Sequence, residues 1–194
     1  MILTKVAPAI GIPLVGALRI AKAVVHVAAV AVGIMDGTET VEDLGERALE
    51  AAEKGINIDD YDNTDEYLRD IREIPLNENR EKYSNEDRSI AGISVLGSIL
   101  RQKIGLEPNL YGLFVQYRDF FTDERVRRYI KYADKTGCYI NDIRNFFSSN
   151  TTFDERERAY NLLVEAEKSS VHDFNSEAFD NELYKAKTSS QCVL

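Results

Sequence analysis

An acidic stretch carries the densest group of side chains that could bind a cation or a charged partner. In a calcium loop that starts at Asp60, Asp62 and Thr64 would take the third and fifth ligand positions. However, Asp65 stands where that loop requires glycine, and Ile71 stands where it requires a bidentate glutamate. An EF-hand is therefore excluded, which leaves a weak divalent site or, as we expect, contact with a basic protein. The expected contacts are Asp59, Asp60, Asp62, Asp65 and Glu66.

Few residues are arranged for catalysis. Neither His26 nor His172 has a nucleophile beside it in the sequence. The chain contains no phosphate-loop pattern, no Rossmann glycine fingerprint and no nucleophile elbow. Carboxylate pairs such as Glu155 and Glu157 are too common to identify a general acid or base. We therefore predict a protein that is not an enzyme and uses neither a cofactor nor a metal.

Residues 126–147 resemble a helix-turn-helix in their spacing. The small Ala133, the turn residue Gly137 and the apolar Ile143 stand where close helix crossing requires them. Any corner between two helices has the same steric needs, however. Residues 122–148 hold six basic and four acidic side chains, a balance that disfavours binding to phosphates. DNA binding is thus the third hypothesis, with contacts expected from Arg127, Asn141, Arg144 and Asn145.

The first 35 residues contain no acidic side chain and are largely apolar. Residues 14–35 could form one helix of about 33 Å, long enough to cross a bilayer. On that helix Arg19, Lys22 and His26 would form one narrow polar stripe. For insertion into a bilayer, the free energy gained by the apolar side chains nearly cancels the cost of inserting the two cations. A helix that spans the membrane would therefore be only marginally stable. A signal peptide is disfavoured because no small-x-small cleavage site precedes Asp36.

We therefore expect this helix to lie in the core or at a subunit contact, with membrane association through residues 12–35 as the alternative. In either case the contacting side chains would be Arg19, Lys22, Val24, Val27 and Val30.

Charge is distributed unevenly along the chain, whose formal net charge is −9. Residues 1–35 carry +3, residues 36–89 carry −11 and residues 90–194 carry −1. Such an acidic face repels nucleic acid and attracts basic partners. Because the two cysteines, Cys138 and Cys192, form no Cys-x-x-Cys pair, the sequence favours a reduced, cytoplasmic protein over a secreted one.

Helical periodicity dominates the rest of the sequence, and no sustained strand alternation occurs. We predict an all-α fold, a compact bundle of about seven or eight helices in one domain, residues 1–194. The interior glycines Gly92 and Gly97 indicate a closely packed neighbour, which we expect to be the Ala-rich first helix. The N-caps expected are Thr40, Asn63, Ser84, Thr122, Thr152 and Ser176. The expected segments are 1–35 (apolar), 36–89 (acidic), 90–168 (helical core) and 169–194 (polar).

These observations together predict a module for protein–protein interaction: an adaptor, a toxin-neutralising partner or an assembly subunit. Its partner would be another protein, basic in character, and the sequence leaves homo-oligomerisation open. Membrane association is the alternative for function and location, and a nucleic-acid partner is not favoured.

Overall fold

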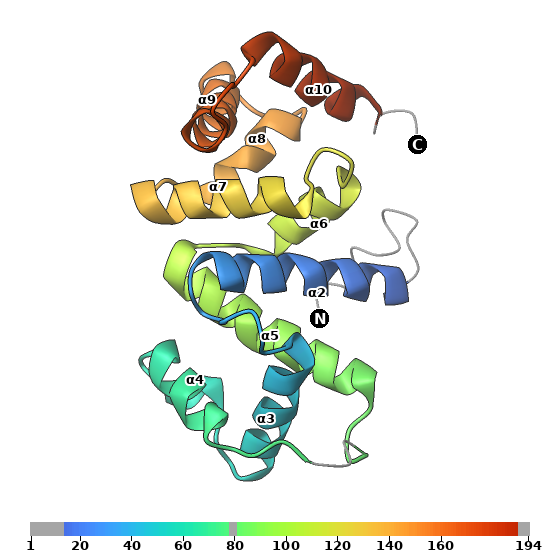
Figure 1. The fold of residues 1–194 in the computed structure, drawn as a ribbon, viewed down its shortest axis with the longest axis vertical. Helices are drawn as coiled ribbons and strands as arrows, with labels where there is room; N and C mark the ends of the chain where they lie inside the picture. Colours follow the sequence, from blue (N-terminus) through green and yellow to red (C-terminus); the bar gives the residue numbers. More distant parts are fainter. Residues whose placement is uncertain (1–13, 78–80, 190–194) are drawn as a thin grey trace.

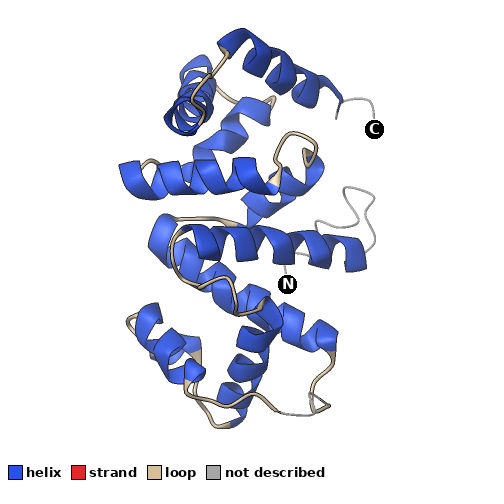
Figure 2. Cartoon of the chain, viewed as in Figure 1, coloured by secondary structure: helices blue, strands red, loops and turns tan. Residues whose placement is uncertain are grey.

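Helices supply all the regular secondary structure of residues 14–77 and 81–189, which are the parts described by the computed structural model (Figure 2). These ranges contain nine α-helices instead of the seven or eight expected, and the all-α prediction is confirmed. Two of the helices, α6 and α8, are short, with 9 and 5 residues. The elements are α2 (Leu14–Ala31), α3 (Val41–Glu53), η1 (Ile58–Asp60), α4 (Thr64–Arg72), α5 (Asn85–Ile104), α6 (Pro108–Gln116), α7 (Asp123–Thr136), η2 (Ile140–Asp142), α8 (Ile143–Phe147), α9 (Phe153–Ser170) and α10 (Ser176–Ser189).

Most of the predicted helix boundaries are confirmed by hydrogen bonds. One predicted N-cap is displaced, because Asn175, and not Ser176, accepts a hydrogen bond from the first turn of α10. Gly105 and Gly137 end α5 and α7 with φ of 66° and 68°, a left-handed conformation that glycine adopts without strain. The caps that accept a first-turn N–H as expected are Thr40, Asn63, Ser84, Thr122 and Thr152.

The helices are stacked along the long axis of the molecule (Figure 1). At one end α3 and α4 pack together, and α5 crosses α3. The other end is formed by α8, α9 and α10 (Figure 1). Although α2 comes first in the described chain, it lies in the middle of this stack and packs against both α5 and α7. One continuous cluster of buried side chains extends from Ala21 in α2 to Leu183 in α10.

The apolar helix α2 ends earlier than expected. It stops at Ala31 instead of Met35, because Gly33 takes a φ of 72° and the chain turns back there. The N–H groups of Ile34 and Met35 then both donate to the carbonyl of Ala29, at 2.8 and 3.3 Å. Among the helices of residues 14–77 and 81–189, none combines the length and the hydropathy needed to span a bilayer.

Close helix packing at glycine occurs between α3 and α5, so the close neighbour at Gly92 is α3 and not the Ala-rich first helix that we expected. A Cβ atom at Gly92 would lie 2.0 Å from the carbonyl oxygen of Val41, and one at Gly45 would lie 1.8 Å from that of Arg88. By contrast, a Cβ atom at Gly97 would meet only the Tyr111 hydroxyl, at 3.5 Å. Glycine therefore lets two backbones touch at the α3–α5 crossing, and α2 also packs against α5.

Candidate functional site

Most carboxylates of the acidic segment are engaged within the chain. Glu39 binds Arg47 and Arg72, at 2.8 and 2.6 Å. Glu46, only 1% exposed, pairs with Arg88 at 3.1 Å and ties α3 to α5. Further carboxylates that accept hydrogen bonds are Glu42, Glu50, Glu53, Asp60, Asp65, Asp70 and Asp87. These groups hold the fold together, so the acidic surface available to a partner is much smaller than the sequence suggests.

The loop between η1 and α4 is fixed to the body of the molecule by side-chain hydrogen bonds. The Tyr61 hydroxyl donates to Asp70 at 2.9 Å, an interaction that raises the pKa of Tyr61. From α5, the Gln102 amide accepts from the Thr64 hydroxyl at 2.5 Å and donates to the backbone carbonyl of Asp62 at 3.5 Å. Gln102, which lies 38 positions from Thr64 in the sequence, thus attaches the loop to α5.

Three carboxylates of this region, those of Asp59, Asp62 and Glu66, are exposed and have no hydrogen bond or ion pair with any residue that the structure describes. We call them the acidic end, because η1 and α4 lie toward one extremity of the molecule (Figure 1). The other two expected contacts serve local structure instead. Asp60 accepts the N–H of Asn57 at 3.1 Å, and Asp65 pairs with Lys103 at 2.9 Å.

The side chains expected at a membrane or subunit contact are divided between the interior and the surface. Val24 and Val27 are each only 7% exposed, whereas Val30 is half-buried and Arg19 is exposed. Lys22 pairs with Glu42 of α3 at 2.6 Å.

Glu42 joins three helices, because it also accepts a hydrogen bond from Ser89 of α5 at 2.9 Å. Burial opposes ionisation of Glu42, but the hydrogen bonds from Lys22 and Ser89 outweigh it and hold its pKa below the usual value. Lys22 thus has a partner inside the chain and is not a free cation for lipid headgroups.

The corner between α7 and α8 places one expected DNA contact in the interior. Asn141 is 7% exposed, accepts the N–H of Glu107 at 3.0 Å and donates to the carbonyl of Gly105. It therefore joins the corner to the connection between α5 and α6, and its amide cannot face a base. The helix that would enter the groove, α8, has only 5 residues. Of the remaining expected contacts, Arg127 and Arg144 are exposed and Asn145 is half-buried.

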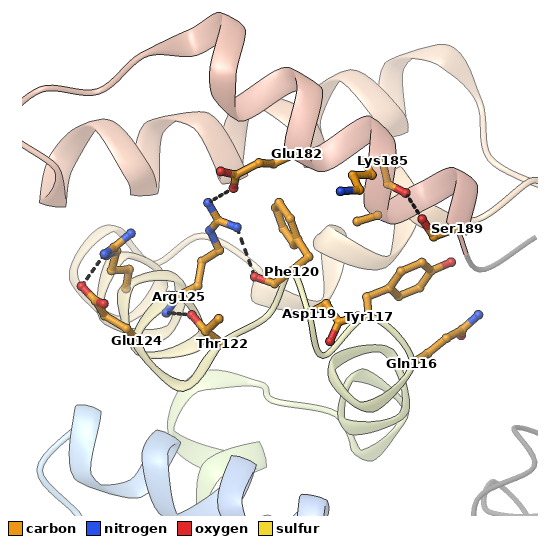
Figure 3. A pocket seen from close by; sticks show the side chains of 12 residues that line it. Gln116, Tyr117, Asp119, Phe120, Thr122, Glu124, Arg125, Glu182, Lys185 and Ser189 are labelled. Atoms are coloured by element: carbon orange, nitrogen blue, oxygen red, sulfur yellow. Dashed lines mark hydrogen bonds and ion pairs between the residues drawn. The ribbon is translucent and has the colours of Figure 1, made fainter.

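A cavity of about 560 Å³ lies between α10 and the segment that joins α6 to α7 (Figure 3). Arg125 of α7 reaches across it and donates from Nη2 to Glu182 of α10 at 2.7 Å. Its Nη1 donates to the carbonyl of Phe120 at 3.2 Å, and the guanidinium lies 4.4 Å from the centre of that ring. Arg125 and Glu182 therefore bind each other at this cavity and attach α10 to α7.

A buried carboxylate, that of Glu167, continues this network through Arg125. Glu167 of α9 is 2% exposed and accepts from Arg125 Nε, Arg128 Nη1 and the Tyr129 hydroxyl, at 2.8, 2.7 and 2.9 Å. Burial, together with the Glu167 charge, raises the pKa of Tyr129 far above its usual value, so Tyr129 stays a neutral donor. Both oxygens of Glu167 are occupied, and the arrangement is that of a structural ion-pair network.

No protein family, curated protein or solved structure matches this chain. The functional conclusion therefore depends on the surfaces themselves. In the described ranges, no group of three or more His, Cys, Asp or Glu side chains is arranged to hold a metal ion.

The network around Glu167 was not predicted from the sequence. Glu165 and Glu167 are both helical glutamates two residues apart, yet the first is exposed and the second is buried. The apolar stripe of α9, which includes Leu163 and Ala166, indicates the buried face in general terms. No local signal shows that arginines of α7 meet Glu167 there.

Proposed function

We propose that this protein is a non-enzymatic helical adaptor whose acidic end binds a basic segment of another protein. The observation that carries the proposal is that Asp59, Asp62 and Glu66 are exposed and unpaired, while most neighbouring carboxylates are engaged. Three like charges within eight residues create a local negative potential that attracts Lys and Arg side chains. The partner chemistry that fits is therefore a lysine- or arginine-rich segment.

The rigidity of the loop supports this proposal. Because Gln102 and Tyr61 attach the loop to the rest of the chain, its backbone does not need to be ordered when a partner arrives. Binding to a pre-ordered surface loses less conformational entropy, so more of the electrostatic attraction appears as affinity. An inhibitor of a basic toxin, an adaptor and an assembly subunit would all use such a surface.

We further propose that α2 acts as a core helix in a cytoplasmic protein. The support is the burial of Val24 and Val27 and the engagement of Lys22 by Glu42. Membrane association through residues 12–35 would need those side chains to face lipid, and DNA binding would need Asn141 to face bases. Both alternatives therefore have less support than the acidic end.

Affinity capture with a charge-reversed bait tests the proposal. The test variant carries Asp59→Lys, Asp62→Lys and Glu66→Lys, and the matched control carries three reversals of exposed acids far from the acidic end. These control reversals are Asp134→Lys, Glu165→Lys and Asp173→Lys. We expect a basic protein to be retained by the wild-type chain and the control, released by salt, and lost from the test variant. Equal retention by all three baits would contradict the proposal.

A further inference from the structure

A second surface lies toward the opposite end of the molecule, where α9 and α10 border a groove of about 400 Å³. The groove is lined mainly by apolar and aromatic side chains, among them Phe146, Tyr160 and Leu183. Phe153 and Tyr184 also border it and are 76% and 68% exposed, the two highest values among the exposed large apolar side chains of the described residues. An apolar groove with aromatic residues at its border is the arrangement that protein contacts use as an anchor site.

The charged residues of the groove are of both signs. Three charged side chains line it, and one of them, Asp180, accepts a hydrogen bond from the Tyr160 hydroxyl at 2.8 Å. The other two, Arg156 and Glu157, are neighbours in α9, and neither side chain has a hydrogen bond or ion pair with a described residue. The Nε–H of Arg156 is moreover buried without an acceptor within the described chain. A strongly basic or strongly acidic partner would therefore place a like charge opposite Arg156 or Glu157.

We propose that this surface is the contact of a symmetric homodimer, in which Phe153 of each copy enters the groove of the other. A twofold contact requires that one patch contain both a projection and the hollow that receives it. Phe153 and the groove meet that requirement. In this dimer Arg156 of one copy would pair with Glu157 of the second copy, and twofold symmetry would repeat the pair on the other side. A second copy thus neutralises both charges that are unpaired in the monomer.

Dimerisation would have a consequence for binding that depends on the proposed function. The acidic end lies toward the extremity formed by α3 and α4, remote from α9 and α10 (Figure 1). A dimer joined through α9 and α10 would therefore present two acidic ends at its two tips. Two linked sites bind a multivalent basic partner more tightly than either site alone. The dimer itself does not depend on this, because its contact shares no residue with the acidic end.

Sedimentation equilibrium of the full chain across micromolar concentrations tests the proposal. We expect the wild-type chain to reach the mass of a dimer and Phe153→Asp to raise the dissociation constant at least about 30-fold, since each substitution acts twice. The control Ile90→Asp removes another exposed apolar side chain, 47% exposed on α5, and should leave dimerisation unchanged. A monomeric wild-type chain would overturn the proposal, whatever else the groove then binds.

A charge swap separates loss of the contact from loss of folding. Arg156→Glu and Glu157→Arg should each weaken the dimer, because each puts like charges opposite one another. The double variant restores opposite charges across the axis and should recover most of the wild-type affinity. Failure of the double variant to recover, with circular dichroism showing that it is folded, would also overturn the proposal.

Discussion

At the residue scale, Glu167 is the side chain on which the packing of α7 against α9 depends most. Removal of its charge leaves Arg125 and Arg128, whose side chains are 17% and 22% exposed, without the buried counter-charge. Removing only one partner of a buried ion pair destabilises a protein by more than the intact pair stabilises it, because the other charge stays buried without a partner. We expect Glu167→Gln to lower the free energy of unfolding by about 3 kcal/mol. Urea unfolding followed by circular dichroism measures this.

Glu165 supplies the control for that prediction. It lies two residues before Glu167, which puts it on a nearly opposite face of α9, and its side chain is 51% exposed and pairs only with Lys168. Glu165→Gln should therefore change the free energy of unfolding by no more than about 0.5 kcal/mol. If the two variants have equally small effects, the network around Glu167 does not form as described.

At the scale of elements, the crossing of α3 and α5 predicts opposite effects on stability for alanine substitutions at two glycines of α5, Gly92 and Gly97. Alanine is favoured over glycine in a helix by about 1 kcal/mol. Gly97→Ala should raise the free energy of unfolding by part of this amount, because the added methyl meets only the Tyr111 hydroxyl, at 3.5 Å. Gly92→Ala should instead lose about 2 kcal/mol or more, because its methyl would lie 2.0 Å from the backbone of Val41. Thermal unfolding of the two variants checks the difference in sign.

The contact between α2 and α3 should make stability depend on acid pH. The pKa of Glu42 in the folded chain is below its ordinary value, despite burial, because Lys22 and Ser89 donate to its carboxylate. Glu42 therefore contributes its full stabilisation at pH values above its pKa in the unfolded chain. This stabilisation is lost as the pH falls through its pKa in the folded chain. At neutral pH Glu42→Gln should cost at most about 1 kcal/mol, as for partly exposed pairs.

Urea unfolding of both chains from neutral pH down to acid pH tests this dependence. The difference between wild type and Glu42→Gln should shrink as pH falls below the ordinary glutamate pKa of about 4.3. A difference that stays constant across that range would show that the carboxylate charge of Glu42 contributes nothing to folding.

At the scale of the whole molecule, the sequence predicts the elements far better than their arrangement. Caps such as Thr40 and stop signals such as Gly105 act within a few residues, so the sequence shows them directly. The position of α2 between α5 and α7 could not be predicted. Apolar periodicity indicates that a helix has a buried face, but many helices of similar composition can cover that face.

The sequence predicts the candidate site only as a stretch of acidic residues. Which of its carboxylates are available depends on distant partners, such as Lys103, which pairs with Asp65 from 38 residues away. The same reason hides Glu167, since its arginines lie about 40 residues earlier in the chain. The sequence shows how many charged residues a segment contains. Only the tertiary structure shows which of them have no partner within the chain.

The whole molecule thus has an acidic end near α4 and an apolar groove between α9 and α10, remote from each other (Figure 1). We propose that the position of three carboxylates, and not the overall negative charge, determines binding to basic chains. A variant that changes net charge equally at a remote surface separates these two explanations.

The most direct test is fluorescence anisotropy with a labelled synthetic peptide rich in lysine and arginine, measured at low and at physiological salt. Asp59→Lys, Asp62→Lys and Glu66→Lys in one chain should weaken binding at least about tenfold. The control chain with Asp134→Lys, Glu165→Lys and Asp173→Lys, whose net charge changes equally, should keep near wild-type affinity. Equal losses in both variants, or no loss in the first, would contradict the proposed role of the acidic end.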